Sequence, residues 1–149
     1  AERMRVTLEE EIAFSRQYLH IEEDRFEDRL RVSVDVAEEV RMAEVPYLIL
    51  QPIVENAMRH GISQQVGPGS IRIRAVKEGD GLVIEIHNTG APLEEASARA
   101  GIGLANTRER LALYYGEAGS LTLSNTQGGV CARLTMPLVL SSEPDLQLA

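Results

Sequence analysis

Five polar residues interrupt an otherwise apolar stretch of the sequence, QPIVENAMRHG (51–61): Gln51, Glu55, Asn56, Arg59 and His60. On a helix with about 3.6 residues per turn, Asn56 lies beneath His60, and Glu55 lies beneath Arg59. The helix would thus carry an amide, a guanidinium and an imidazole on adjoining faces, although the sequence around it is apolar. The pattern therefore indicates either a ligand site or a solvated helix face with ordinary side-chain pairs.

A second carboxamide ends an alternating segment, LVIEIHN (82–88). Alternation places Asn88 in the same row as Leu82, Ile84 and Ile86, which should point into the core. A buried amide that lacks hydrogen bonds costs about 1–3 kcal/mol, so Asn88 needs a partner. The alternative is that Asn88 only begins the turn NTGAP, where Asn and Gly are common for backbone reasons.

The third candidate is the segment AGIGLANTRERL, in which Gly101 and Gly103 stand where a helix should begin. Glycines at a helix start let a phosphate approach the backbone N–H groups and the positive end of the helix dipole. The preceding residues 89–101 are small and polar, so we expect a flexible loop that could fold over a bound ligand. A flexible join without a ligand is the other interpretation.

The remaining pattern predicts the elements that must position these residues. A first helix is expected over 6–27, with Thr7 as its N-cap. A second helix should run from Pro46 to about His60 and be closed by Gly61. A third should begin at the glycines and end at Gly116. Strands are expected over 30–36, 71–76, 82–88, 121–125 and 130–137. The fold class is therefore α/β (α+β), a two-layer sandwich with a five-stranded mixed or antiparallel sheet and helices on one face.

Composition restricts the class of partner. The net charge of −8 and the lack of a basic stripe argue against nucleic acid. No apolar run approaches the ~20 residues that a membrane-spanning helix needs. Cys131 is the single cysteine, which excludes an internal disulfide and suits a reducing cytoplasm, and packing is its expected role. Because the first residue is Ala, we expect either a processed product or an excised piece of a longer chain.

Together, ENAMRHG, NTG and GIGL occur in the order of the boxes of the Bergerat-type ATP-binding fold, which histidine kinases, type II topoisomerases, mismatch-repair ATPases and ninety-kilodalton heat-shock chaperones share. VPYLILQPIVENAMRHG and GIGLANTRERLALYYG resemble the ATP-binding catalytic (HATPase, GHKL-type) domain of LytS-type sensor histidine kinases, over about residues 8–137. The resemblance implies a helical segment at 1–28, a catalytic domain at 29–138 and a flexible tail at 139–149. Residues 1–28 would end the dimerisation and phosphoacceptor hairpin, with exposed Leu, Ile and Phe side chains.

The resemblance also implies roles for individual residues. Asn56 would be the Mg²⁺ ligand, Arg59 and His60 would face the phosphates of ATP, and Asn88 would accept a hydrogen bond from the adenine amino group. Gly90 would let the backbone pass close to the base. The second glycine box would offer backbone N–H groups to the phosphates, and residues 91–100 would form a short ATP lid; the box comprises Gly101, Ile102, Gly103 and Leu104.

The sequence departs from the family pattern at two positions. Asn88 stands where the family usually has Asp, and Pro92 replaces the second glycine of its DxGxG motif. Since a charge-assisted hydrogen bond is about twice as strong as a neutral one, Asn88 predicts weaker nucleotide binding.

ATPases of this fold usually carry a water-activating carboxylate one helical turn before the magnesium Asn, where this sequence has Pro52. We therefore expect a protein-histidine kinase that transfers the γ-phosphoryl group to a His outside this chain. A PHFLFN-like phosphoacceptor motif is missing from the sequence, so the chain alone should bind Mg-ATP but turn over little. The alternatives are a non-catalytic interaction module that has lost ATP binding, and an ATPase clamp, against which Pro52 and the short lid argue.

Further expectations follow from the resemblance to LytS-type kinases. The full-length kinase would be a homodimer through its helical hairpin, and a response regulator would receive the phosphoryl group. The chain would be the cytoplasmic domain of a membrane-attached bacterial sensor kinase.

Overall fold

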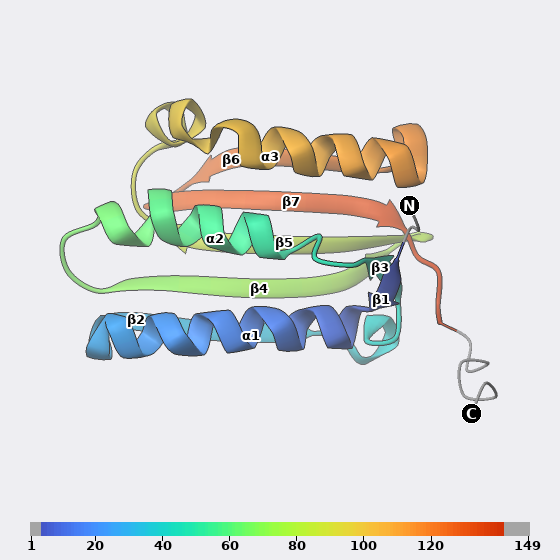
Figure 1. Ribbon diagram of the computed structural model, residues 1–149, viewed down its shortest axis with the longest axis horizontal. Helices are drawn as coiled ribbons and strands as arrows, with labels where there is room; N and C mark the ends of the chain where they lie inside the picture. The colour runs from blue at the N-terminus through green and yellow to red at the C-terminus, as the bar shows by residue number, and fades with distance from the viewer. Residues whose placement is uncertain (1–3, 142–149) are drawn as a thin grey trace.

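The computed structural model describes residues 4–141, apart from the side chains of residues 28 and 93–103. It contains a five-stranded sheet covered on one face by α-helices (Figure 1). The sheet strands are β2 (Leu30–Val36), β4 (Gly69–Glu78), β5 (Gly81–Thr89), β6 (Ser120–Thr126) and β7 (Gly129–Pro137). The helices are α1 (Leu8–Arg25), α2 (Gln51–His60) and α3 (Leu93–Tyr115). The short elements are strands β1 (Arg5–Thr7) and β3 (Glu44–Pro46), and the 3₁₀ turns Glu27–Arg29, Glu38–Val40, Ile62–Gln64 and Gly116–Ala118.

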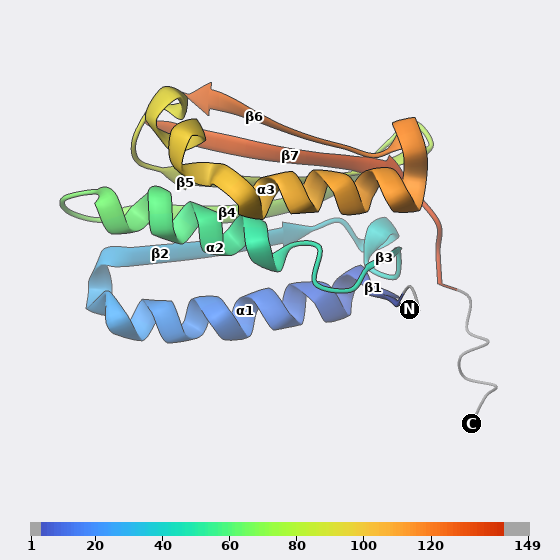
Figure 2. The ribbon, with the colours of Figure 1, turned by 45° about the horizontal axis from the view of Figure 1, so that its top comes forward.

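The sheet is mixed, and its strand order is β2-β4-β5-β7-β6. Strands β2 and β4 pair in parallel, whereas every other neighbouring pair is antiparallel. The three helices lie side by side on the same face, and within residues 4–141 no α-helix covers the opposite face (Figure 2). The predicted fold class, a two-layer sandwich with helices on one face, is thus confirmed, and so are the five predicted strands.

Helix α1 belongs to the same core as the sheet. It begins at the predicted N-cap, where Thr7 and Glu10 form a capping box. Its apolar side chains Leu8, Ile12 and Leu19 are at most 5% exposed and pack in the common core. The expectation of exposed apolar side chains is therefore wrong for these three residues, which follow the helical period and face the core. Ile21 of the same helix is 59% exposed, in line with that expectation.

Helix α2 begins at Gln51, five residues later than predicted from Pro46. Pro46 instead ends β3, where it pairs with Arg5 of β1. Between β3 and α2, Leu48 adopts a left-handed conformation (φ 56°). The buried carboxylate of Glu11 accepts hydrogen bonds from the N–H groups of Leu48 and Leu50, at 2.9 and 3.0 Å. Burial raises the pKa of Glu11, and these two backbone hydrogen bonds oppose that rise.

Helix α3 differs most from the prediction. Residues 93–100, expected as a loop, form its first turns, so the helix begins at Leu93 and not at the glycines. Glu94, Glu95 and several alanines favour a helix in this segment, and this propensity outweighs the glycines that follow it. The helix still ends at Gly116, as predicted.

The C-terminal segment pairs with the chain near β3 for as far as the structure describes it. The N–H of Glu44 donates to the carbonyl of Val139, and the N–H of Ser141 donates to the carbonyl of Met42. Residues 139–141 are therefore held by hydrogen bonds, contrary to the expected flexible tail. The rest of that tail, 142–149, lies outside the described residues.

Candidate functional site

The polar residues of α2 divide between two surfaces. Asn56 and His60, one helical turn apart, line the same pocket between α2 and the sheet. Arg59 is exposed and borders a different groove with Glu55, on the side of α1. The structure thus brings His60, but not Arg59, together with Asn56. The 100° step between successive helical residues explains this separation.

Asn88 reaches the same pocket from the end of β5. Its side-chain Nδ2 donates a 2.9 Å hydrogen bond to the carbonyl of Thr89, which orients the carboxamide. As predicted from alternation, Asn88 follows Ile86 on the face that the helices cover, whereas His87 points to the other face. Both carboxamides singled out from the sequence therefore border one pocket.

Two glycines let the end of β5 approach the end of α2 closely. Gly90 has φ +137°, and a Cβ at this position would lie 2.9 Å from the Cα and the carbonyl oxygen of Gly61. A Cβ on Gly61 would in turn lie 2.2 Å from Nδ2 of Asn88. Since real Cβ atoms do not approach other atoms so closely, any larger residue would push Asn88 out of place. The close approach that the structure shows at Gly90 is to the backbone of Gly61, and the expected approach of Gly90 to the adenine base stays a prediction.

The walls of the pocket are mostly apolar. They come from α2, from the helix-facing side of the sheet and from the segment after β5, and comprise Ile53, Ala57, Ile86, Ala91, Leu123, Val130 and Ala132. The free volume is about 20 Å³, which is room for one water molecule. Apolar walls with few polar groups at one end are typical of small-molecule sites. The walls from β6 and β7 were not identified from the sequence, although alternation in 130–137 places Val130 and Ala132 on this face.

The predicted glycine box lies within α3 rather than at its start. Gly101, Ile102 and Gly103 belong to the helix, and their side-chain positions are not described. Leu104 is 1% exposed and packs in the core. Inside a helix, backbone N–H groups bond to carbonyl groups four residues earlier. In this conformation the box therefore does not present the free donors that a helix start would offer.

None of the helices within residues 4–141 combines the length and the apolar composition that crossing a lipid bilayer requires.

Residues 43–140 match the family model described as Histidine kinase-, DNA gyrase B-, and HSP90-like ATPase. The chain is 35% identical over 137 residues to the sensor histidine kinase YesM of Bacillus subtilis, covering 89% of this chain and 24% of the relative. It is 37% identical over 112 residues to the sensor histidine kinase BtsS of Escherichia coli, covering 75% and 20%. The sensor protein LytS of Oceanobacillus iheyensis is 29% identical, with 89% and 25% covered. The chain thus spans a quarter or less of the length of these relatives.

Solved structures support the same fold. The catalytic domain of histidine kinase ThkA superimposes with a TM-score of 0.68 at 18% identity, covering 95% of this chain and all of that one. The mycobacterial sensor histidine kinase MprB gives a TM-score of 0.64 at 17% identity, with 94% and 100% covered. The pocket between α2 and β5 thus lies in a histidine kinase catalytic-domain fold, as the resemblance implied. The chain belongs to the histidine kinase-, DNA gyrase B- and HSP90-like ATPase family, and within it to the catalytic domains of LytS-type sensor histidine kinases.

Proposed function

We propose that this chain binds Mg-ATP in the pocket between α2 and β5 and presents the γ-phosphoryl group to a histidine in a helical domain outside the chain. The observation that carries the proposal is the convergence of Asn56, His60 and Asn88 on one apolar-walled pocket. Family membership supports it, because the matching relatives include several sensor histidine kinases.

The polar groups at the pocket fit the parts of Mg-ATP. Magnesium takes oxygen ligands and keeps several waters and phosphate oxygens, so one protein ligand, the carboxamide oxygen of Asn56, suffices. Bound there, Mg²⁺ would neutralise charge on the phosphate oxygens. His60, one turn further along α2, would donate to a phosphate oxygen. Asn88 uses its Nδ2 on Thr89, which leaves Oδ1 to accept from the adenine amino group.

Nucleotide binding on this proposal requires the pocket to widen. About 20 Å³ cannot hold a purine, and most of the lining residues from the sheet and α2 are buried in the core. The wall that can move is the one at Ala91, which leads into the first turns of α3. These turns lie at the same end of the molecule as the C-terminal end of α2 (Figures 1 and 2). Unwinding them would also release the N–H groups of Gly101 and Gly103 toward the phosphates.

The described side chains favour phosphoryl transfer over hydrolysis. Pro52 occupies the helical position one turn before Asn56 and cannot activate water. Glu55 is turned away from the pocket, and its Oε2 accepts a 3.0 Å hydrogen bond from Gln51. Transfer needs mainly positioning and charge neutralisation, which Asn56 and His60 can supply. We infer that the acceptor histidine lies in the rest of the kinase, and that a response regulator then receives the phosphoryl group.

The test is isothermal calorimetry with ATP, with and without Mg²⁺. Wild-type protein should release or absorb heat with ATP and Mg²⁺, and Asn56→Ala should lose the Mg²⁺-dependent part of the affinity while keeping the wild-type melting temperature. Gln17→Ala is the matched control, since it removes an exposed carboxamide on α1, remote from the pocket. Unchanged affinity in Asn56→Ala refutes the assignment of the metal ligand.

Two other outcomes favour the alternative functions. The absence of binding heat in the wild type would favour a non-catalytic interaction module. Steady release of inorganic phosphate, which Asn56→Ala abolishes, would favour an ATPase clamp. The kinase assignment predicts binding without steady release.

A further inference from the structure

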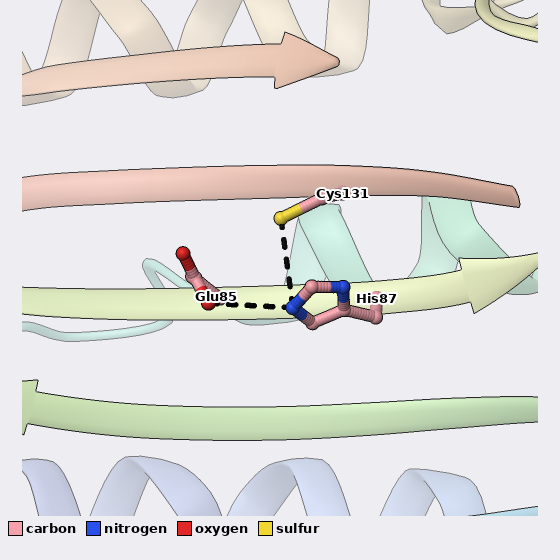
Figure 3. A group of neighbouring side chains, drawn as sticks. All are labelled: Glu85, His87 and Cys131. Atoms are coloured by element: carbon pink, nitrogen blue, oxygen red, sulfur yellow. Dashed lines mark hydrogen bonds and ion pairs between the residues drawn. The ribbon is translucent and has the colours of Figure 1, made fainter. Parts of the chain in front are cut away.

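A cluster of three metal-ligating side chains lies on the sheet face that the helices leave uncovered. Glu85 and His87 project from β5, and Cys131 projects from β7 beside them (Figure 3). The ligating atoms of all three lie within 4.8 Å of one another. His87 and Cys131 are direct partners in the antiparallel register of the two strands. The cluster is therefore built on paired strands of the central sheet rather than on loops.

The Nε2 atom of His87 is the centre of this cluster. It lies 3.3 Å from Oε1 of Glu85 and 3.7 Å from Sγ of Cys131. A tetrahedral zinc ion with ordinary bond lengths separates a nitrogen and an oxygen ligand by about 3.3 Å, and a nitrogen and a sulfur ligand by about 3.6 Å. Both distances in the structure match these edges without movement of the backbone. A small rotation of the Glu85 side chain would bring its oxygen to a similar distance from the sulfur.

We propose that Glu85, His87 and Cys131 bind a divalent transition metal ion of the zinc class, on the sheet face opposite the nucleotide pocket. Thiolate and imidazole ligands select zinc and its chemical relatives over magnesium or calcium, which need several oxygen ligands. Three protein ligands leave the fourth tetrahedral position for water. The partly exposed His87 (35%) leaves this position open to solvent.

Two arginines bear on the charge balance of this site. Arg133 Nη1 donates a 2.9 Å hydrogen bond to Oε2 of Glu85, so that oxygen is occupied and Oε1 faces His87. Arg74 lies farther away, at 3.5 Å from Oε1, and its side chain is 39% exposed, so it can turn outward. A carboxylate and a thiolate together neutralise the charge of a divalent ion. Arg133 would then act as the outer hydrogen-bond partner that orients the ligating carboxylate.

Cobalt(II) titration tests the proposal directly. Cys131 is the single cysteine of the 149-residue sequence, so a thiolate-to-cobalt charge-transfer band can arise from this residue alone. Under a non-chelating reductant, we expect the band to saturate at one equivalent of Co²⁺ and to be displaced by Zn²⁺. Cys131→Ser should abolish the band. His87→Gln should weaken Co²⁺ binding by about tenfold or more, since even outer-sphere partners are worth that much.

The control is His20→Gln, which alters an exposed histidine next to a carboxylate on α1. It should leave the titration unchanged. Zn²⁺ should raise the melting temperature of the wild type and not that of Cys131→Ser, which is a second readout that needs no spectroscopic band. Circular dichroism of the metal-free variants shows whether each is folded. If His87→Gln does not fold, Glu85→Gln takes its place in the titration.

Three results would overturn the proposal. They are the absence of a charge-transfer band in the wild type, a band that His87→Gln and Glu85→Gln leave unchanged, and saturation at half an equivalent. The last would mean that two chains share one ion through their cysteines.

Discussion

Replacing Gly90 by Ala is the sharpest test of how the end of β5 is held against α2. Gly90 has φ +137°, outside the left-handed region that Asn or Asp tolerate, and its added Cβ would lie 2.9 Å from two backbone atoms of Gly61. Backbone atoms cannot rotate away as a side chain can. We therefore expect both a conformational cost of about 1–3 kcal/mol and an overpacking cost of about 1–3 kcal/mol. The free energy of unfolding should fall by about 2–6 kcal/mol in total.

Gly79→Ala separates these two costs. Gly79, in the turn between β4 and β5, also has a positive φ (+60°), but an added Cβ would have no neighbour within 4 Å. The free energy of unfolding of Gly79→Ala should fall by only about 1–2 kcal/mol, the cost of the backbone conformation alone. Urea unfolding followed by circular dichroism measures both variants against the wild type. A loss at Gly90 no larger than that at Gly79 would refute the close approach of the two backbones.

The same pair of variants connects stability with the proposed site. Gly90→Ala must displace Gly61, and Gly61 contacts the carboxamide of Asn88. We expect Gly90→Ala to lose nucleotide affinity under conditions where it is still folded, and Gly79→Ala to retain it. Calorimetry with Mg-ATP at low temperature, where both variants are folded, checks this. If Gly90→Ala binds as well as the wild type, Asn88 does not depend on the glycine contact.

Two further predictions concern single side chains. Glu11→Ala should lower the free energy of unfolding by about 2–6 kcal/mol, because the partly buried N–H of Leu48 and the buried N–H of Leu50 would each lose their acceptor at about 1–3 kcal/mol. Urea unfolding of this variant beside Glu23→Ala, on the more exposed side of α1, measures the loss, and equal losses in the two variants would contradict the prediction. Asn88→Asp should tighten Mg-ATP binding by about five- to tenfold, since a charged acceptor adds about 1 kcal/mol over a neutral one. The same variant should have a lower melting temperature, because Asp cannot donate a hydrogen bond to the carbonyl of Thr89. Calorimetry that shows no gain in affinity would mean that Asn88 does not meet the adenine.

Periodicity in the sequence predicted the part of the site that depends on local geometry. The alternation of 82–88 placed Asn88 on the helix-facing side, and the helical period placed Asn56 under His60; both are confirmed. Each depends only on the spacing of residues within one element, which the backbone geometry of strand or helix fixes. Which elements lie next to one another followed from the family resemblance rather than from the spacing.

Features that depend on contacts between distant segments were predicted wrongly or missed. Pro46 is a good first residue for a helix, but pairing with Arg5 in the β1–β3 ribbon extends it into a strand. Cys131 and His87 alternate correctly within their own strands, yet their contact depends on the register between β5 and β7. A shift by one residue would place Cys131 on the other face, and the sequence of either strand alone does not exclude it.

The loop before α2 connects helices α1 and α3 with the helix that carries Asn56. Leu48 holds an unfavourable left-handed conformation, which persists only where neighbouring groups fix it. Its N–H is fixed by Glu11 of α1, and its carbonyl accepts a 3.2 Å hydrogen bond from Arg110 of α3. Arg110 also donates to the carbonyl of Tyr47, at 2.7 Å. Because this loop leads directly into α2, the direction of the helix that carries Asn56 depends on α1 and α3 together. A displacement of α1 would therefore move Asn56, because the buried carboxylate of Glu11 holds Leu48, and Leu48 leads into α2.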